Sequence, residues 1–108
     1  MDESDRERLT HMLEAGEEAI EFSQTRSRAN FLAVVKSIEI IGEAASKVSP
    51  EFRAATAGIP WPELIGIRNR LVHAYFDMNI EVIWKAVDED LPSLIQRLRA
   101  ILNAPPAP

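Results

Sequence analysis

Residues 28–48 constrain the fold of this chain more than any other stretch. Drawn as a helix, this stretch places five polar side chains within an arc of about 100°, while apolar or small residues dominate the rest of the circumference. Such a helix must be covered on several sides, so we expect it at the centre of a bundle or in an interface. Gly42 in its middle costs about 1 kcal/mol relative to alanine, which close packing of another backbone would offset. The five polar residues are Lys36, Glu39, Glu43, Ser46 and Lys47.

Three further stretches repeat apolar residues at the three- and four-residue spacing of a helix: residues 3–23, the segment from Trp61 onward, and residues 80–102. A shorter helix is expected to begin at Ser49 and Pro50, because a cap followed by proline is a common helix start. We find no strand-like alternation and no glycine-rich phosphate loop. The sequence therefore predicts an all-α fold, an antiparallel bundle of four main helices with one short extra helix.

Single residues mark the expected helix ends. Ser27 is suited to cap the second helix, and Gly58 is suited to a left-handed position where the short helix ends. Residues 77–79 are expected to form a tight connection, with Asn79 capping the last helix. Pro92 falls inside that last helix, where it removes one backbone hydrogen bond and predicts a kink.

With 108 residues, the chain is expected to form one domain over residues 1–103, followed by a loose Pro/Ala-rich tail over residues 104–108. It has no cysteine, which excludes disulfides and thiolate metal sites and suits a cytoplasmic protein. The acidic start does not resemble a signal peptide, and no apolar run is long enough to span a membrane. The net charge of −5 argues against a broad electrostatic grip on nucleic acid and leaves acidic surface for a basic partner.

Residues 68–75, with the sequence RNRLVHAY, gather the most reactive side chains of the chain. At about 100° per residue, Asn69 and His73 lie one turn apart on the same helix face. Arg68 and His73 are five positions apart, so their Cβ directions diverge by roughly 140°. One straight helix therefore does not hold that pair side by side. Three alternatives remain: the arginine reaches around, the helix frays near His73, or a second copy of the chain completes the site.

An imidazole and a guanidinium together allow a narrow range of chemistry. The imidazole takes or gives a proton near neutrality, and the guanidinium grips a phosphate through two parallel hydrogen bonds. This pair is the minimum needed to cleave RNA without a metal: the 2′-hydroxyl is deprotonated and attacks its own phosphate, and the arginine meets the developing charge. From spacing alone the alternative is that His73 caps the helix C-terminus and Arg68 makes a surface salt bridge.

Glu39 and Glu43 lie one turn apart on the second helix. A carboxylate pair can bind a metal ion, but two carboxylates without a third ligand are a weak indication. We favour pairing with Arg68 or Arg70, which would orient the guanidinium. Neither a metal nor a cofactor is expected.

Residues 59–76, IPWPELIGIRNRLVHAYF, resemble the signature of HepT-like proteins in the HEPN superfamily, small helical ribonuclease toxins with an R-x-x-x-x-H-x-Y motif. The resemblance extends upstream to IEIIGEAA at residues 38–45 and downstream to Trp84 and DLP at residues 90–92. It covers roughly residues 9–102. The Arg-to-His spacing alone is weak, whereas its combination with the I-P-W, I-G-E-A and H-x-Y elements in this order is specific.

The resemblance implies an endoribonuclease that works without a metal at a site formed where two protomers of a homodimer meet. It implies that His73 transfers the proton and that Arg68 stabilises the phosphate. Supporting roles fall to Asn69, Arg70, Glu39 and Glu43.

The resemblance also implies a partner, a nucleotidyltransferase-type antitoxin that silences the toxin by adding AMP to Tyr75. Without the resemblance, Tyr75 could equally plug the end of the bundle as an amphipathic side chain. The alternative function is a non-catalytic helical dimer that scaffolds or regulates the nucleotidyltransferase.

Overall fold

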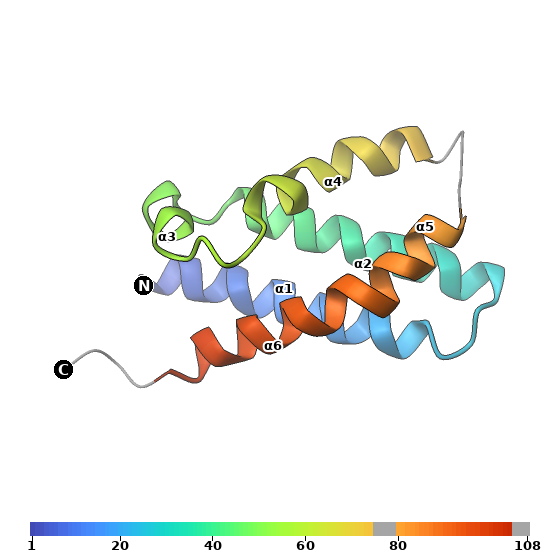
Figure 1. Ribbon diagram of the computed structural model, residues 1–108, viewed down its shortest axis with the longest axis horizontal. Coiled ribbons are helices and arrows are strands. Elements are labelled where there is room, and N and C mark those ends of the chain that lie inside the picture. The colour runs from blue at the N-terminus through green and yellow to red at the C-terminus, as the bar shows by residue number, and fades with distance from the viewer. Residues whose placement is uncertain (75–79, 105–108) are drawn as a thin grey trace.

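The computed structural model describes residues 1–74 and 80–104, with the side chains of residues 68–74 left out of the description. The described residues form helices and connections and contain no strand, so the predicted all-α fold is confirmed (Figure 1). None of the described helices is both long enough and apolar enough to cross a membrane. The elements are α1 (Glu3–Phe22), α2 (Arg28–Ser46), α3 (Pro50–Ala55), α4 (Trp61–Ala74), α5 (Ile80–Lys85), the π-helical turn η1 (Ala86–Asp90) and α6 (Leu91–Leu102).

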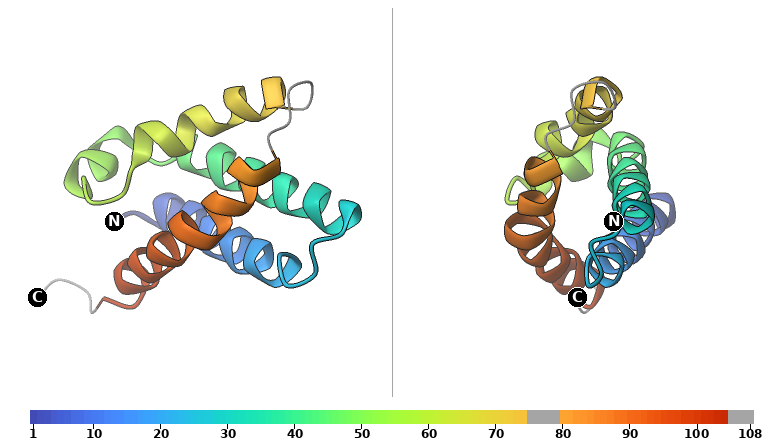
Figure 2. Two further views of the ribbon diagram at one scale, coloured as in Figure 1. Left: turned by 45° about the vertical axis from the view of Figure 1, so that its right-hand side comes forward. Right: turned by 90° about the vertical axis from the view of Figure 1, so that its right-hand side faces the viewer.

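Helix α2 lies between α1 and α4 and buries much of its apolar circumference against them. It packs along α1 on one side and along α4 on the other, while α6 packs against α1 (Figures 1 and 2). The end-on view in Figure 2 shows the helices of the bundle surrounding a common interior. The main helices are therefore α1, α2, α4 and the α5–α6 segment, and α3 is the short extra helix.

The core is densest where α1, α2 and α6 meet. Leu9, Val34 and Leu98, one from each helix, are fully buried. Gly16 permits the close approach of α1 to α6, because a Cβ atom at this position would lie 3.1 Å from Cγ1 of Ile95. The sequence pointed to Gly42 for such a contact; Gly42 is buried in α2, and its close contact with another backbone stays a prediction.

Two of the predicted caps are confirmed and one prediction is wrong. The hydroxyls of Ser27 and Ser49 accept hydrogen bonds from backbone N–H groups three residues later and cap α2 and α3. Gly58 does not terminate α3 in a left-handed conformation: the helix ends at Ala55, and no described glycine has a positive φ. The chain turns instead at Thr56, whose carbonyl oxygen accepts hydrogen bonds from the backbone N–H of residue 59 at 3.0 Å and from an indole N–H at 3.1 Å. The predicted connection over residues 77–79 and the cap at residue 79 lie outside the described residues.

The last predicted helix is interrupted directly before Pro92. The N–H of Leu91 bonds to the carbonyl oxygen of Ala86, five residues back, which gives a π-helical turn between α5 and α6. Pro92 lacks the N–H that an α-helix would need at this point, so the helix changes its hydrogen-bonding pattern there. The irregularity expected from this proline is present, and it takes the form of a widened turn.

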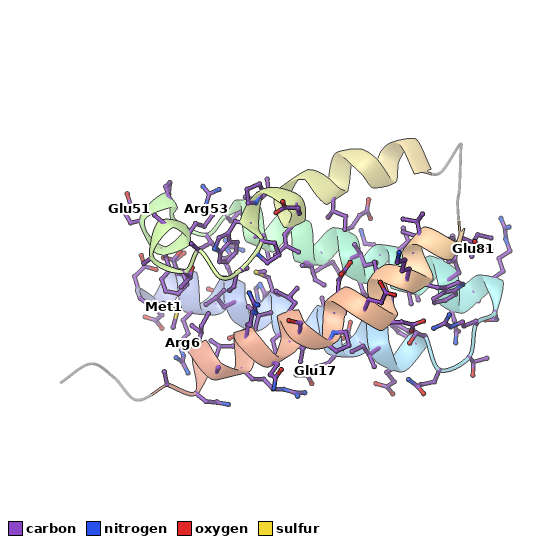
Figure 3. All side chains as sticks on the ribbon, viewed as in Figure 1. Met1, Arg6, Glu17, Glu51, Arg53 and Glu81 are labelled. Atoms are coloured by element: carbon purple, nitrogen blue, oxygen red, sulfur yellow. The ribbon has the colours of Figure 1, made fainter. Side chains whose placement is uncertain are left out.

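Asp5 joins the start of α1 to the start of α3 through a buried carboxylate. Its side chain is only 3% exposed and accepts hydrogen bonds from the backbone N–H of Ser49 at 2.8 Å and from the Ser49 hydroxyl at 2.6 Å. The hydrogen bond from the Ser49 hydroxyl lowers the pKa of Asp5 below its ordinary value of 3.8, although burial opposes the shift. Near it, Arg6 donates to the carbonyl oxygen of Leu102 at 3.0 Å and ties α1 to the end of α6 (Figure 3).

Candidate active site

Helix α4 carries the RNRLVHA part of the motif on one continuous backbone. The helix runs through Ala74, so Arg68 and His73 are both helical and the helix does not end before His73. Five residues on an α-helix separate their Cβ directions by roughly 140°. Of the three alternatives, an arginine that reaches around and a second copy of the chain both remain. The side chains of the motif residues on α4, and Tyr75 altogether, lie outside the described part of the chain, so their roles stay predictions.

The N-terminal half of α4 is held firmly. Trp61 is 4% exposed, and its indole N–H donates to the carbonyl oxygen and the hydroxyl of Thr56 at 3.1 and 3.2 Å. Ile59 is buried just before the helix begins, and Leu64 and Ile67 pack against the core while staying partly exposed. Because α4 rests along α2, this anchoring fixes the direction in which the helix carries the motif away from α3 (Figure 1).

A cluster of aromatic and charged side chains holds α5, the helix that follows the motif in the chain. Arg26 Nη2 lies 2.6 Å from Asp88 Oδ1, and the guanidinium carbon lies 4.6 Å from the centroid of the Trp84 ring. Phe31 meets the same indole edge-on, with ring centroids 5.6 Å apart. The α1–α2 connection is thereby fastened to α5 and η1, so the segment that follows the motif is fixed to the rest of the bundle.

Glu39 and Glu43 both have lysine partners on α2. Lys36 Nζ lies 3.7 Å from Glu39 Oε2, and Lys47 Nζ lies 3.4 Å from Glu43 Oε1. Within the described residues, no group of three histidine, cysteine or acidic side chains is arranged to hold a metal ion. The predicted pairing of these glutamates with the motif arginines involves side chains that the structure does not describe, and it stays a prediction. The two glutamates line a shallow groove of about 310 Å³ between α1 and α2, together with Arg8, His11, Lys36, Ile40, Ala44 and Lys47.

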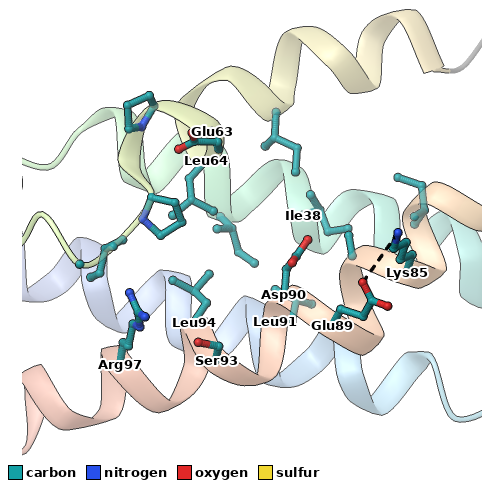
Figure 4. A pocket seen from close by; sticks show the side chains of 18 of the residues that line it. Ile38, Glu63, Leu64, Lys85, Glu89, Asp90, Leu91, Ser93, Leu94 and Arg97 are labelled. Atoms are coloured by element: carbon teal, nitrogen blue, oxygen red, sulfur yellow. Dashed lines mark ion pairs between the residues drawn. The ribbon is translucent and has the colours of Figure 1, made fainter.

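A larger groove of about 1170 Å³ runs between α4 and the α5–α6 segment (Figure 4). Ile38 and Ile41 of α2 form its floor, and Ile67 lines its α4 wall immediately before the motif begins. On the opposite wall Lys85 Nζ lies 4.0 Å from Glu89 Oε2. Sequence reasoning missed this groove, because it depends on how far α4 stands from α6 and not on any local pattern.

Comparison with known proteins places this sequence in a family. The sequence model of the family described as "Ribonuclease HepT-like" matches residues 7–101 of the chain. The chain belongs to the HepT-like ribonuclease family. The resemblance found in residues 59–76 is thereby confirmed over nearly the whole chain.

Individual relatives agree with this assignment. A protein from Thermococcus cleftensis, named as a probable ribonuclease HepT, is 38% identical over 101 residues, covering 87% of this chain and 92% of the relative. Two proteins named as candidate RNases are 35% and 33% identical, one from Caldanaerobacter subterraneus subsp. tengcongensis and one from Methanocaldococcus jannaschii. Alignment with the first covers 88% of this chain and 91% of the relative, and alignment with the second covers 86% and 92%. No solved structure matches this HepT-like chain.

Proposed function

We propose that this HepT-like protein is a metal-independent endoribonuclease and the toxin of a toxin–antitoxin pair. The observation that carries the proposal is the helical placement of Arg68 and His73 on α4, in a chain that matches the family over residues 7–101. Relatives named as ribonucleases that align with most of the chain support the same activity.

The proposed reaction needs one proton acceptor and one fixed cation. His73 removes the proton of the RNA 2′-hydroxyl, and the resulting oxygen attacks the adjacent phosphorus. The bond to the 5′-oxygen of the next nucleotide breaks, and that oxygen is protonated as it leaves. Arg68 stabilises the negative charge that develops on the phosphate, while Asn69 and Arg70 position it. The products are a 2′,3′-cyclic phosphate and a free 5′-hydroxyl.

A second copy of the chain is proposed to complete the site. Because Arg68 and His73 diverge by roughly 140° on one helix, residues from two motif helices that face each other can meet where one helix alone cannot. The active species is therefore a homodimer, and light scattering at micromolar concentration should report twice the mass of the chain. A monomer that cleaves RNA would refute the shared site.

Control is proposed to act through Tyr75. A nucleotidyltransferase-type antitoxin would transfer AMP from ATP to the tyrosine hydroxyl, forming a phosphodiester and releasing pyrophosphate. The attached phosphate would compete with the RNA phosphate for Arg68 and Arg70, and the adenosine would block access to the site. The modification would thus silence the enzyme without unfolding it.

The decisive experiment incubates purified protein with total RNA, comparing the natural sequence with the variant His73→Ala. Cleavage by the natural sequence alone, persisting in EDTA and leaving cyclic phosphate ends, would support the proposal. Loss of cleavage on chelation, with recovery on addition of magnesium, would defeat the metal-free mechanism.

A non-catalytic helical subunit that regulates a nucleotidyltransferase is the second candidate. The observation in its favour is electrostatic: the net charge is −5, and all three lysines lie within 4.0 Å of a glutamate carboxylate. Binding of RNA would therefore depend on arginine side chains to contact its phosphates. Absence of both RNA cleavage and toxicity in the experiment above would favour this candidate.

A further inference from the structure

The smaller groove, between α1 and α2, gathers positive charge on an acidic chain. Arg8 and His11 line it from α1, and Lys36 and Lys47 line it from α2. Two glutamate carboxylates of α2 line it as well. Three permanently charged cations thus stand beside two carboxylates, although the net charge of the whole chain is −5. An anion therefore meets less repulsion at this groove than the chain as a whole would exert.

Among the permanent cations of this groove, Arg8 is the one without a counter-ion in the described part of the chain. Lys36 Nζ lies 3.7 Å from Glu39 Oε2, and Lys47 Nζ lies 3.4 Å from Glu43 Oε1. The side chain of Arg8 forms no ion pair or hydrogen bond with the described residues, and its Nε atom is buried without an acceptor. A guanidinium can hold a phosphate through two parallel hydrogen bonds. A phosphate in the groove would therefore supply the counter-ion that Arg8 lacks.

The smaller groove and the motif lie on the same side of the bundle. Ile38 of α2 and Ile67 of α4 both line the larger groove, between α4 and the α5–α6 segment. An ideal α-helix places Lys36 about 160° around α2 from Ile38, and position 73 about 120° around α4 from Ile67. Both positions are thus directed away from the larger groove, toward the side of the bundle opposite α6 (Figure 2). Because α4 packs along α2, a strand at the motif reaches the smaller groove by crossing one helix, about 10–12 Å wide.

We propose that the smaller groove holds the phosphates of a single-stranded RNA a few nucleotides from the scissile bond, with Arg8 as the main contact. This inference rests on the proposed function, because it assigns the surface that holds the substrate of the ribonuclease away from the reaction. Lys36 and Lys47 can turn from their glutamates to the phosphates, since exposed ion pairs are weak. Phosphate contacts carry no base information, so the groove holds the strand whatever its sequence.

Binding of a fluorescent single-stranded RNA oligonucleotide provides the test. The measurements use the His73→Ala background, so that the RNA stays intact, and follow anisotropy between about 50 and 200 mM salt. Arg8→Gln should weaken binding by about 3- to 10-fold, because one charge-assisted contact is lost. It should also reduce the slope of log Kd against log salt concentration by about 0.7, the value for one phosphate contact on a single strand. Arg8→Lys, which keeps the charge, should keep the slope and lose less affinity.

Arg99→Gln is the matched control, because it removes the same charge from an exposed arginine on α6 that lines neither groove. It should leave affinity and salt slope unchanged, and circular dichroism checks that each variant keeps its helix content. Equal losses for Arg8→Gln and Arg99→Gln, an unchanged slope in Arg8→Gln, or no RNA binding by the parent would each overturn the proposal.

The same variants separate this proposal from the ribonuclease itself. If RNA binding depends on Arg8 but the natural sequence does not cleave RNA, the phosphate contact stands and the ribonuclease proposal fails. If the natural sequence cleaves RNA and binding is indifferent to Arg8, the ribonuclease proposal stands and the contact is wrong.

Discussion

The α1–α2–α6 core and helix α4 differ in how completely their apolar side chains are buried. In the core, Leu9, Val34 and Leu98 are fully buried, and a glycine allows α1 and α6 to touch. On α4, by contrast, Leu64 and Ile67 stay partly exposed, and a groove separates the helix from α6. We therefore expect the core to supply most of the stability, while the motif is carried by a helix that rests mainly on α2. Changes in the motif and changes in the core should therefore have separable effects.

The largest effect is expected on catalysis, from changes in the motif that leave the core untouched. His73→Ala and Arg68→Ala should each lower RNA cleavage by about 10²–10⁴-fold, because proton transfer and charge stabilisation each contribute on that scale. Gel-based cleavage assays measure the loss, and thermal unfolding followed by circular dichroism should show an unchanged midpoint. A matching fall in stability would mean that these residues hold the fold and not the reaction.

A pair of leucine truncations compares the two regions directly. Leu98→Ala should cost about 2–5 kcal/mol of unfolding free energy, because it opens a cavity in the closed core. Leu64→Ala on α4 should cost less, because this side chain is already partly exposed to water. Urea unfolding monitored by circular dichroism gives both values. Equal losses would contradict the contrast in packing between the core and α4.

A smaller and pH-dependent effect is expected at Asp5. Asp5→Asn should cost about 1–3 kcal/mol at pH 7, because an amide cannot accept both hydrogen bonds from Ser49. The folded-state pKa of Asp5 is lowered, so its contribution is complete above the ordinary value of 3.8 and is lost as the pH falls through the lowered value. The difference in unfolding free energy between the natural sequence and the variant should therefore shrink below about pH 4. Glu18→Gln, at an exposed position on α1, is the control and should show no such trend.

The smallest effect on cleavage is expected from Tyr75→Phe. Its phenol is not needed for the proposed reaction, so RNA cleavage and toxicity should be retained. Incubation with a nucleotidyltransferase-type antitoxin, ATP and magnesium should add an adenylyl-sized mass to the natural sequence but not to this variant, as read by mass spectrometry. Full modification of the variant, or undiminished cleavage by the modified natural protein, would rule out control through this residue.

Local patterns predicted most of the fold. The position of α2 between α1 and α4 fits the narrow polar arc on its surface. Ser27 and Ser49 cap helices because their hydroxyls need only N–H groups three residues away. The prediction at Gly58 was wrong because the chain turns at Thr56, where the indole N–H of Trp61 donates a hydrogen bond to the Thr56 carbonyl oxygen. The local sequence around Gly58 gives no sign of that contact.

Contacts between parts of the chain that are distant in sequence could not be predicted from local patterns. Asp5 looked like one more charge in an acidic start, since its partner lies 44 residues away. The groove beside α4 depends on the distance between two helices, for which no residue pattern gives a signal. The motif itself was predicted on a helix, and α4 confirms that placement for Arg68 and His73. Whether one helix or two bring their side chains together stays a prediction, because those side chains lie outside the described part of the chain.

The π-helical turn between α5 and α6 changes the angle at which side chains of the two helices point around the common helix axis. Ile83, Val87, Leu91 and Ile95 are all buried and follow one another at steps of four residues. On an uninterrupted α-helix, each such step would drift by about 40° around the axis, and the series would wind away from the core. A turn whose hydrogen bonds span five residues takes up that drift and keeps the series aimed inward. Deleting one residue from 86–90 would remove the extra residue that the wide turn accommodates, so the segment would continue as an ordinary α-helix and α5 would keep nearly its present orientation relative to α6.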